Sequence, residues 1–397
     1  MGIFDWFSKE EINQLLLEIV SIESHKDYKH KELEVAQWIK EFFEREQINV
    51  KLEEVEDKRP NVIASLSNND QQEVKLMFNG HIDTVPGFDM DYPAFEPFIK
   101  NNKIYGRGTA DMKGAIIAMM VAFAVAKRSQ LKISENIIFT GVVDEEEASI
   151  GAEDLVNRGY KPEYVIFGEP TQLDICTTHK GMEWVEITFH GKSGHASRPS
   201  EGNNAVYAAS DFCQVIETEL QAKLNKTKNE KLGSGSVSVG RITGGNMPNI
   251  IPASCKVEID RRWLPDENLE EVNKELFNIT KDIAEKRGIT FSFRIMDELT
   301  ASMGNHPYSF PSDDEFLMRV TEITEQITGT PVEQKGFPAW SDAGILGVQT
   351  DAKCLILGPG NIDQAHAANE YCSLEEIYQA SEIYFNLIKS MEETNYG

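Results

Sequence analysis

Short apolar segments alternate with helical patterns along most of the chain, and this alternation restricts the possible folds more than any other feature. The candidate strands are 61–64, 74–79, 136–143, 164–167 and 354–357. Apolar residues recur at helical spacing in 9–46, and 115–127 is a strongly apolar helix. Such alternation is typical of a mostly parallel sheet with helices on both faces, so we expect an α/β domain.

A different rhythm begins near Lys180. The candidate elements there are a strand at 182–190, a helix at 203–223, strands at 236–242 and 254–260, a helix at 269–286 and a strand at 290–295. This βαββαβ order is typical of a ferredoxin-like sandwich. A chain of 397 residues suits two domains. We therefore expect an inserted α+β domain at 180–298, within a first domain made of 1–179 and 299–397.

The charge and the cysteines restrict the partners and the compartment. A formal net charge of −26 repels phosphate backbones, which disfavours nucleic-acid binding. The five cysteines form no CxxC pair, which favours free thiols in a reducing compartment. Residues 1–10 lack the basic and apolar regions of a signal peptide, and the longest apolar run, 115–126, is too short to cross a bilayer. We expect a cytoplasmic protein without a membrane partner.

His81 and Asp83 directly follow the strand at 74–79. The carboxyl ends of strands are where open α/β sheets bind ligands. His81 could bind a metal ion, and Asp83 could accept the other ring N–H of His81 and so fix its tautomer. A loop histidine with a solvated aspartate is the alternative, and it would be preferred if this short motif stood alone.

Asp111 opens the apolar helix. The preceding 105–110 segment begins like a dinucleotide-binding GxGxxG motif, but Asp111 replaces the third glycine and would repel a pyrophosphate. With two oxygens, Asp111 could bridge two cations. Capping of the helix N-terminus is an equally good interpretation of this residue alone.

Four acids, 144–147, follow the strand at 136–143. Adjacent carboxylates at a buried strand end repel one another, and metal cations would relieve that repulsion. Neighbouring side chains point in different directions, so one of Glu145 and Glu146 could bind metal while the other takes a proton from water. A solvated acidic turn is the alternative.

Glu169 follows the strand at 164–167, and His366 comes shortly after the strand at 354–357. Each motif is weak alone, but five potential ligands just past successive strands are not expected by chance. Two histidines and three carboxylates suit Zn²⁺, Co²⁺ or Mn²⁺. A shared aspartate can hold two ions roughly 3.5–4 Å apart, as in hydrolytic two-metal sites.

In their order and over nearly the whole chain, these motifs resemble the zinc-dependent family of aminoacylase, acetylornithine deacetylase, succinyl-diaminopimelate desuccinylase and carboxypeptidase G2. The resemblance implies a zinc-exopeptidase-like catalytic domain that binds two Zn²⁺ ions. His81 and Glu169 would hold one ion. Glu146 and His366 would hold the other, with Asp111 as the bridge.

The resemblance also implies roles for the remaining acids. Glu145 would be the general base, and Asp83 would support His81. The chain departs from many relatives at Glu147, where they have a small or apolar residue, although the acidic run still reaches Gly151 at the family's spacing.

The inserted domain would mediate a homodimer. His195, in the 191–199 stretch, would reach into the active site of the other subunit and stabilise the oxyanion. Asn249 would contact the substrate, and Arg262 would bind a substrate carboxylate, for which a guanidinium fork is apt. The alternatives are a surface loop histidine, a turn asparagine and a structural ion pair.

The function implied is metal-assisted hydrolysis of an amide bond. The 168–171 segment favours an N-acyl amino acid of the acetylornithine or succinyl-diaminopimelate type. A dipeptidase or carboxypeptidase acting on short peptides is the first alternative. The second alternative is a catalytically silent relative that binds a metabolite or a partner. This alternative predicts a broken ligand set, but the set in this sequence is intact.

Overall fold

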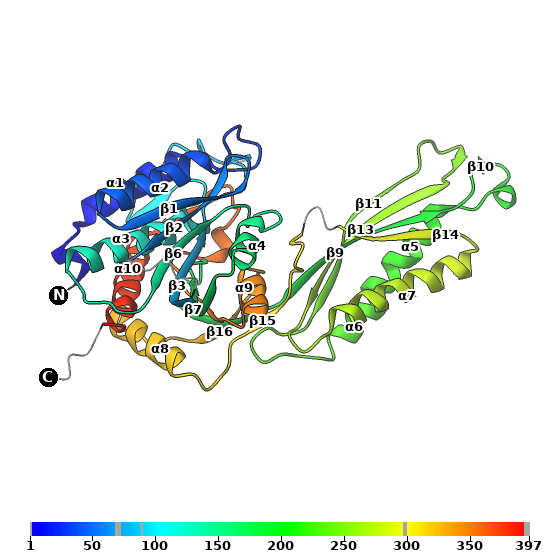
Figure 1. Ribbon diagram of the computed structural model, residues 1–397. Helices are drawn as coiled ribbons and strands as arrows, with labels where there is room; N and C mark the ends of the chain where they lie inside the picture. Colours follow the sequence, from blue (N-terminus) through cyan, green and yellow to red (C-terminus); the bar gives the residue numbers. More distant parts are fainter. Residues whose placement is uncertain (1, 68–72, 89, 297–299, 393–397) are drawn as a thin grey trace. The chain divides into compact units, whose positions relative to one another are not determined.

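The computed structural model describes residues 2–67, 73–88, 90–296 and 300–392, which form two compact units (Figure 1). The first unit comprises 1–177, 310–337 and 341–397, and the second comprises 178–309 and 338–340. The expected insertion, 180–298, lies within the second unit but is shorter than it. Trp340 donates to the carbonyl of His306 at 3.1 Å, which links 338–340 to the rest of the second unit.

The first unit is built on a large sheet. Its strands, in spatial order, are β1 (Asn49–Glu56), β2 (Arg59–Ser65), β6 (Ile137–Val142), β3 (Glu73–His81), β7 (Lys161–Phe167), β17 (Lys353–Ile356) and β8 (Ile175–His179), with β16 (Gln334–Phe337) paired to β8. β3 runs parallel to β6 and β7, and β17 runs parallel to β7. These four strands form the centre of the sheet.

The sheet is mixed, so the expectation of a mostly parallel sheet is wrong at its flanks. β1 and β2 pair antiparallel, β2 pairs antiparallel with β6, and β8 pairs antiparallel with β17. The reason at one flank is the short connection between Glu56 and Arg59, because parallel neighbours need a crossover of a dozen or more residues.

Helices cover both faces of this sheet. They are α1 (Lys9–Ser21), α2 (Leu33–Arg45), α3 (Gly114–Arg128), α4 (Ile150–Asn157), α8 (Glu315–Thr328), α9 (Ala343–Gln349) and α10 (Leu374–Lys389). Figure 1 shows α3 and α10 on one side of the sheet and α4 and α9 on the other. Every residue of β6 is buried, as expected for a strand covered on both faces.

The apolar helix α3 belongs to the core. Among the described residues, Thr109–Arg128 is the one helical stretch long and apolar enough to cross a membrane, and its apolar 18-residue window is completely buried inside the protein. Phe123 of α3 packs edge-to-face on Phe78 of β3, with ring centroids 5.7 Å apart. The prediction of a buried helix is confirmed.

The second unit has the predicted order of elements. These are β9 (Gly181–His190), α5 (Ala205–Val215), which continues through Ile216–Leu220 into α6 (Gln221–Leu224), β11 (Ser236–Gly244), β13 (Ser254–Trp263), α7 (Leu269–Arg287) and β14 (Thr290–Ile295). The strands form an antiparallel sheet in the order β11-β13-β9-β14.

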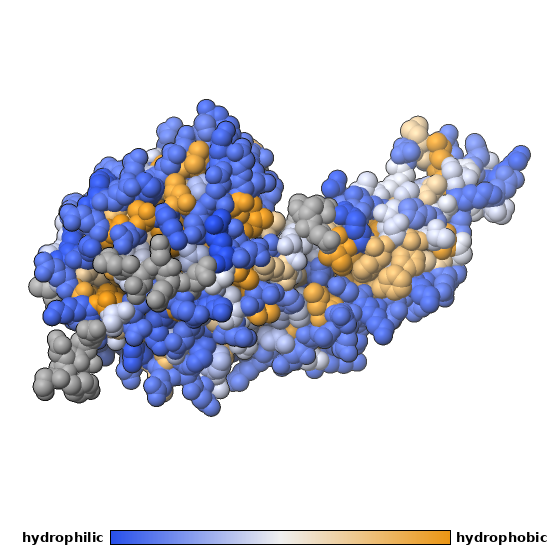
Figure 2. Space-filling model, in the orientation of Figure 1, coloured by the Kyte–Doolittle hydropathy of each residue, from blue (hydrophilic) through white to orange (hydrophobic). Residues whose placement is uncertain are grey.

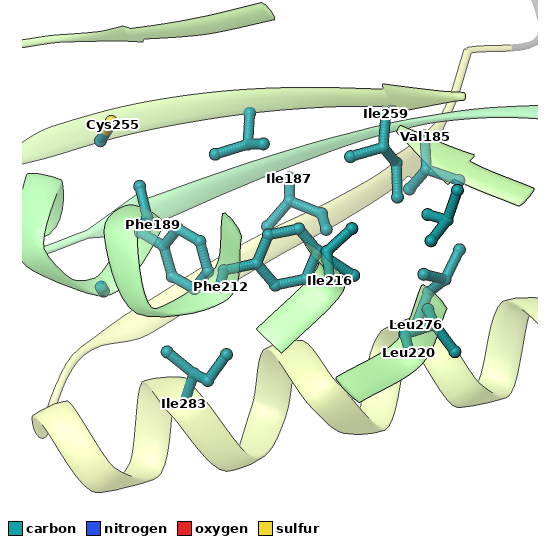
Figure 3. Packing of buried hydrophobic residues seen from close by; sticks show 14 of the residues in the cluster. Val185, Ile187, Phe189, Phe212, Ile216, Leu220, Cys255, Ile259, Leu276 and Ile283 are labelled. Carbon is teal, nitrogen blue, oxygen red and sulfur yellow. The ribbon is translucent and has the colours of Figure 1, made fainter. Parts of the chain in front are cut away.

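One face of this sheet packs on α5 and α7 (Figure 3). Val185, Ile187 and Phe189 of β9 are fully buried against Phe212 of α5 and Leu276 of α7. The intervening residues of β9 are more exposed, as the period of two in a strand requires. In Figure 2 hydrophilic residues cover most of the visible face of the first unit, whereas the second unit also shows a band of pale and orange residues.

Candidate metal centre

The potential ligands meet at the carboxyl edge of the parallel strands. His81 is the last residue of β3, Glu146 follows β6 and Glu169 follows β7. β3 lies between β6 and β7, so parallel pairing brings these three chain segments to one edge. The strand ends predicted from the sequence therefore place these side chains where a ligand site is expected.

Asp111 lies between the two histidines. Its Oδ1 is 3.0 Å from His81 Nε2, and its Oδ2 is 3.5 Å from His366 Nε2. Glu146 Oε2 lies 3.0 Å from His366 Nε2, and Glu169 Oε1 lies 4.0 Å from His81 Nε2. The five side chains thus form two groups that share Asp111.

Three of these residues already have the spacing of a metal site. One potential ligand atom each from His81, Asp111 and Glu146 lies within 4.8 Å of the other two. The donor set of imidazole nitrogens and carboxylate oxygens suits Zn²⁺ and similar ions. The residues present therefore fit a bound metal ion.

The charges of the site are mutually stabilised. Hydrogen bonds to Asp111 and Glu146 raise the pKa of His366 to about 10. Burial would raise the pKa of Asp111, but hydrogen bonds from His366 and His81 lower it below its usual range. The histidines and carboxylates thus stabilise one another here, and a bound metal ion would compete with protons for the same ligand atoms.

Glu145 and Glu169 have no such balance. Burial raises the pKa of each well above its ordinary value. His81 opposes both shifts, while neighbouring carboxylates add to them, Glu169 acting on Glu145 and Asp111 acting on Glu169. A carboxylate whose pKa is shifted upward is suited to proton transfer. Cations bound nearby would lower both pKa values again.

Asp83 contacts both the ring of His81 and the backbone of the acidic loop. Its main-chain carbonyl, 3.0 Å from His81 Nδ1, is closer to the ring than its carboxylate, which is 3.5 Å away. The two carboxylate oxygens accept the backbone N–H groups of Glu145 and Glu146 at 3.2 and 3.1 Å. The carboxylate is drawn to these two donors, so Asp83 orients the acidic loop as well as the histidine.

The two outer acids of the 144–147 run have partners that the sequence did not indicate. Asp144 forms an ion pair with Arg59, whose guanidinium also binds Glu32 at 2.6 and 2.9 Å. Glu147 forms an ion pair with Lys26. The outer acids are therefore structural, and the inner pair, Glu145 and Glu146, faces the potential metal ligands.

Asp342 also lies close to the centre. It is 2% exposed, and its Oδ1 has no hydrogen-bond partner among the residues that the structure describes. Burial raises its pKa to about 7, and the carboxylates of Asp83 and Asp144 add to the shift, while Ser149 and His81 oppose it.

The other candidate residues belong to the second unit. His195 is exposed on a two-stranded ribbon, in which β10 (Gly194–His195) pairs with β12 (Ile250–Ile251), and its Nδ1 lies 2.7 Å from Ser197 Oγ. Asn249 is exposed beside it, and its carbonyl accepts the N–H of Ala196 at 3.0 Å. The structure therefore brings His195 and Asn249 together.

Arg262 is already paired. Its guanidinium makes two bonds to the carboxylate of Asp260, at 2.8 and 2.9 Å. Both residues lie on β13 two positions apart, so their side chains share one face of the sheet. This is the structural ion pair that the sequence allowed as an alternative.

The conserved pattern of Peptidase family M20/M25/M40 matches residues 77–390. The chain belongs to this family. It is similar to acetylornithine deacetylase of Pasteurella multocida, with 30% identity over 381 residues that cover 93% of each chain. A probable succinyl-diaminopimelate desuccinylase of Staphylococcus epidermidis is 26% identical over 415 residues, covering 96% of this chain and 98% of the relative.

A solved structure shows the same fold. Aminopeptidase PepT from Bacillus cereus superimposes with a TM-score of 0.79 at 20% identity, covering 97% of this chain and 99% of that one. Family membership, the deacylase relatives and the ligand spacing together identify a metal-dependent hydrolase.

Proposed function

We propose that the chain is a two-zinc amidohydrolase that removes the acyl group from an N-acyl amino acid. The observation that carries the proposal is the position of Asp111 between His81 and His366. His81 and Glu169 would hold one Zn²⁺, and Glu146 and His366 the other, with Asp111 bridging. Co²⁺ and Mn²⁺ are chemically acceptable substitutes.

In this proposal Glu145 is the general base of the hydrolysis. When bound, the two ions would supply Lewis acidity to the scissile carbonyl and to the attacking water. Glu145 takes the proton from that water and returns it to the leaving amine. Burial raises the pKa of Glu145, and bound cations would lower it again toward the range in which the carboxylate can accept a proton.

The residues of the second unit are assigned to substrate. We propose a homodimer in which His195 of a second copy stabilises the oxyanion. Asn249 would contact the substrate. Arg262 would release Asp260 and bind the carboxylate of the substrate instead. This exchange replaces one carboxylate by another, so the guanidinium keeps a two-bond partner.

The substrate proposal rests on the relatives. Two relatives are named acetylornithine deacetylase and probable succinyl-diaminopimelate desuccinylase. An N-acetyl or N-succinyl amino acid is therefore the first substrate to test. A short peptide is the alternative, because aminopeptidase PepT shares the fold. We assign the protein to the cytoplasm, and its five free cysteines support a reducing compartment.

The decisive experiment compares two acids of one loop. Zinc- or cobalt-loaded protein is assayed on acetylornithine, succinyl-diaminopimelate and dipeptides, together with Glu145→Gln and the control Glu147→Gln. We expect Glu145→Gln to lower turnover by roughly 10²- to 10⁴-fold with both metals bound. Glu147→Gln should stay within a few fold of the wild type, because Glu147 pairs with Lys26.

The outcomes separate the alternatives. Near-normal turnover of Glu145→Gln with both metals bound would contradict the assignment of the base. Hydrolysis of dipeptides without deacylation would favour the peptidase. A chain that binds no zinc, and gains no activity from added zinc or cobalt, would favour the silent relative.

A further inference from the structure

Glu370 is a buried carboxylate that the proposed chemistry does not use. It is 0% exposed, and it lies four residues after His366 in the first unit. Its Oε1 accepts the backbone N–H groups of Ala110 and Asp111 at 2.9 and 3.3 Å, and its Oε2 accepts Arg107 Nη1 at 2.7 Å. The carboxylate therefore contacts the peptide groups at the bridging residue itself.

The main chain of Glu370 is held to the same segment. Its carbonyl accepts the Tyr92 hydroxyl at 2.5 Å and the N–H of Gly106 at 3.3 Å. The next residue, Tyr371, begins β18 (Tyr371–Ser373), which pairs with β5 (Lys103–Tyr105). These contacts join the segment that carries His366 to the segment that carries Asp111.

Burying this ion pair has a cost. Burial raises the pKa of Glu370 to about 7, although Arg107 opposes the shift. A buried ion pair is on balance a weak source of stability, because desolvation offsets the attraction. A role as an N-terminal cap accounts for two accepted N–H groups, but an uncharged Ser or Asn would meet that need without Arg107.

We propose that Glu370, paired with Arg107, is the positioning residue that fixes the peptide of Asp111 and so permits both metal positions to be filled. The inference rests on the proposed two-metal site. Asp111 presents one oxygen toward each histidine, so a turn of its backbone moves both oxygens. Residues that orient metal ligands typically change metal affinity 10- to 100-fold when they are replaced.

The two positions should respond unequally. The His81 side chain is 1% exposed, whereas the His366 side chain is 53% exposed. His81 also has a second contact to the Asp83 carbonyl, at 3.0 Å, on its other ring nitrogen. The His366 position is therefore more dependent on a correctly oriented Asp111, and the ion bound there is the one that loss of Glu370 should weaken.

The test measures metal binding rather than turnover alone. In Glu370→Gln, a single amide faces Arg107 on one side and two N–H groups on the other, so a donor meets a donor in either orientation. We expect the second Zn²⁺ to bind about 10- to 100-fold more weakly in competition with a chelator, while the first changes less than about threefold. Loading with Co²⁺ should give less spin coupling between the ions by electron paramagnetic resonance.

A double variant and a control keep the test specific. Arg107→Met with Glu370→Gln removes the conflict and keeps an acceptor for both N–H groups, so binding of the second ion should recover to within a few fold, even if the single variant does not fold. Glu46→Gln is the control, because Glu46 makes a similar two-bond pair with Arg128, at 2.7 and 2.8 Å, away from the ligand segments.

Two outcomes would overturn the inference. One is a folded Glu370→Gln protein that binds both ions with wild-type affinity. The other is a double variant that folds but does not recover the second ion. A wild-type protein that fails to bind two ions would instead refute the proposed function, so the two failures are distinguishable.

Discussion

The second unit has an apolar interior, whereas the first unit collects charged side chains at one edge of its sheet. In the second unit, Phe189 and Phe212 are fully buried in a cluster of aliphatic and aromatic residues. In the first unit, His81 is 1% exposed and Asp111 is 8% exposed, and both lie beside further carboxylates. The two regions therefore contribute differently to stability. Apolar packing stabilises the fold, while buried charge costs stability unless cations offset it.

The comparison indicates that the two units can be perturbed separately. Changes in the charged edge should alter metal binding and catalysis more than folding. Changes in the apolar cluster should alter folding more than metal binding. Three measurements test this separation.

The largest effect is expected from Asp111→Asn. An amide has one acceptor oxygen, so it cannot bridge two cations as a carboxylate does. Since metal ions contribute several kcal/mol of transition-state stabilisation, turnover should fall at least about 10³-fold. Metal analysis should find fewer than two ions per chain, with circular dichroism unchanged.

The matched control for this loss is Asp154→Asn. Asp154 lies on α4 in the first unit and pairs at 2.5 Å with Arg158, the residue that follows this helix. Its replacement should leave metal content and turnover within a few fold of the wild type. Loss of both metals from this control would show that the centre tolerates no change of charge in the first unit.

The second effect is a loss of stability from Phe212→Ala. Phe212 is 0% exposed and its ring centroid lies 6.0 Å from that of Phe189. Removing a buried phenylalanine typically lowers the free energy of unfolding by roughly 3–5 kcal/mol. Urea unfolding should show this loss, while the folded protein keeps its metals.

Tyr207→Ala is the control on the same helix. Tyr207 is 59% exposed, so its replacement should change the free energy of unfolding by less than about 0.5 kcal/mol. If Phe212→Ala released the metals before any unfolding transition, the proposed independence of the two units would be refuted.

The smallest effect concerns pH and His179, at the start of the second unit. His179 is 0% exposed, and burial lowers its pKa to about 4. The unfolded chain, with a pKa of about 6.5, then binds a proton that the folded chain does not. The resulting stability is complete above pH 6.5 and is lost as the pH falls toward 4, by about 2 kcal/mol between pH 7.5 and 5.

The ring resonances of His179 report this directly. They should remain those of a neutral imidazole down to about pH 5 in the folded protein. The exposed His195 serves as the internal comparison in the same spectra. A titration midpoint of His179 near 6.5 would mean that the ring is solvated in the folded state.

Much of the fold follows from local patterns. The βαββαβ order of the second unit was predictable because alternating strands and amphipathic helices leave a periodic trace in the sequence. The potential ligands at the ends of β3, β6 and β7 were predictable for a related reason, because a polar residue directly after a buried strand must lie at the edge of the sheet. The pairing of Arg262 with Asp260 had a local signal too, since the two residues are two positions apart on one strand.

Other features had no local signal. Arg59 joins Glu32 to Asp144, and Glu370 reaches peptide groups 260 and 259 residues away. The antiparallel pairing of the flanking strands also escaped prediction, because pairing direction depends on how the chain connects and not on the residues within a strand.

The sequence alone determined the kind of site, a set of histidines and carboxylates past successive strands, because composition and strand position are properties of short segments. The family resemblance implied how the set would be divided between two ions, and the tertiary structure shows which of these side chains meet. It placed Asp111 between His81, 30 residues away, and His366, and it gave the outer acids of the 144–147 run to Arg59 and Lys26. The physical reason is that a side chain's partner is set by distance in space, which the packing of the sheet and its helices creates.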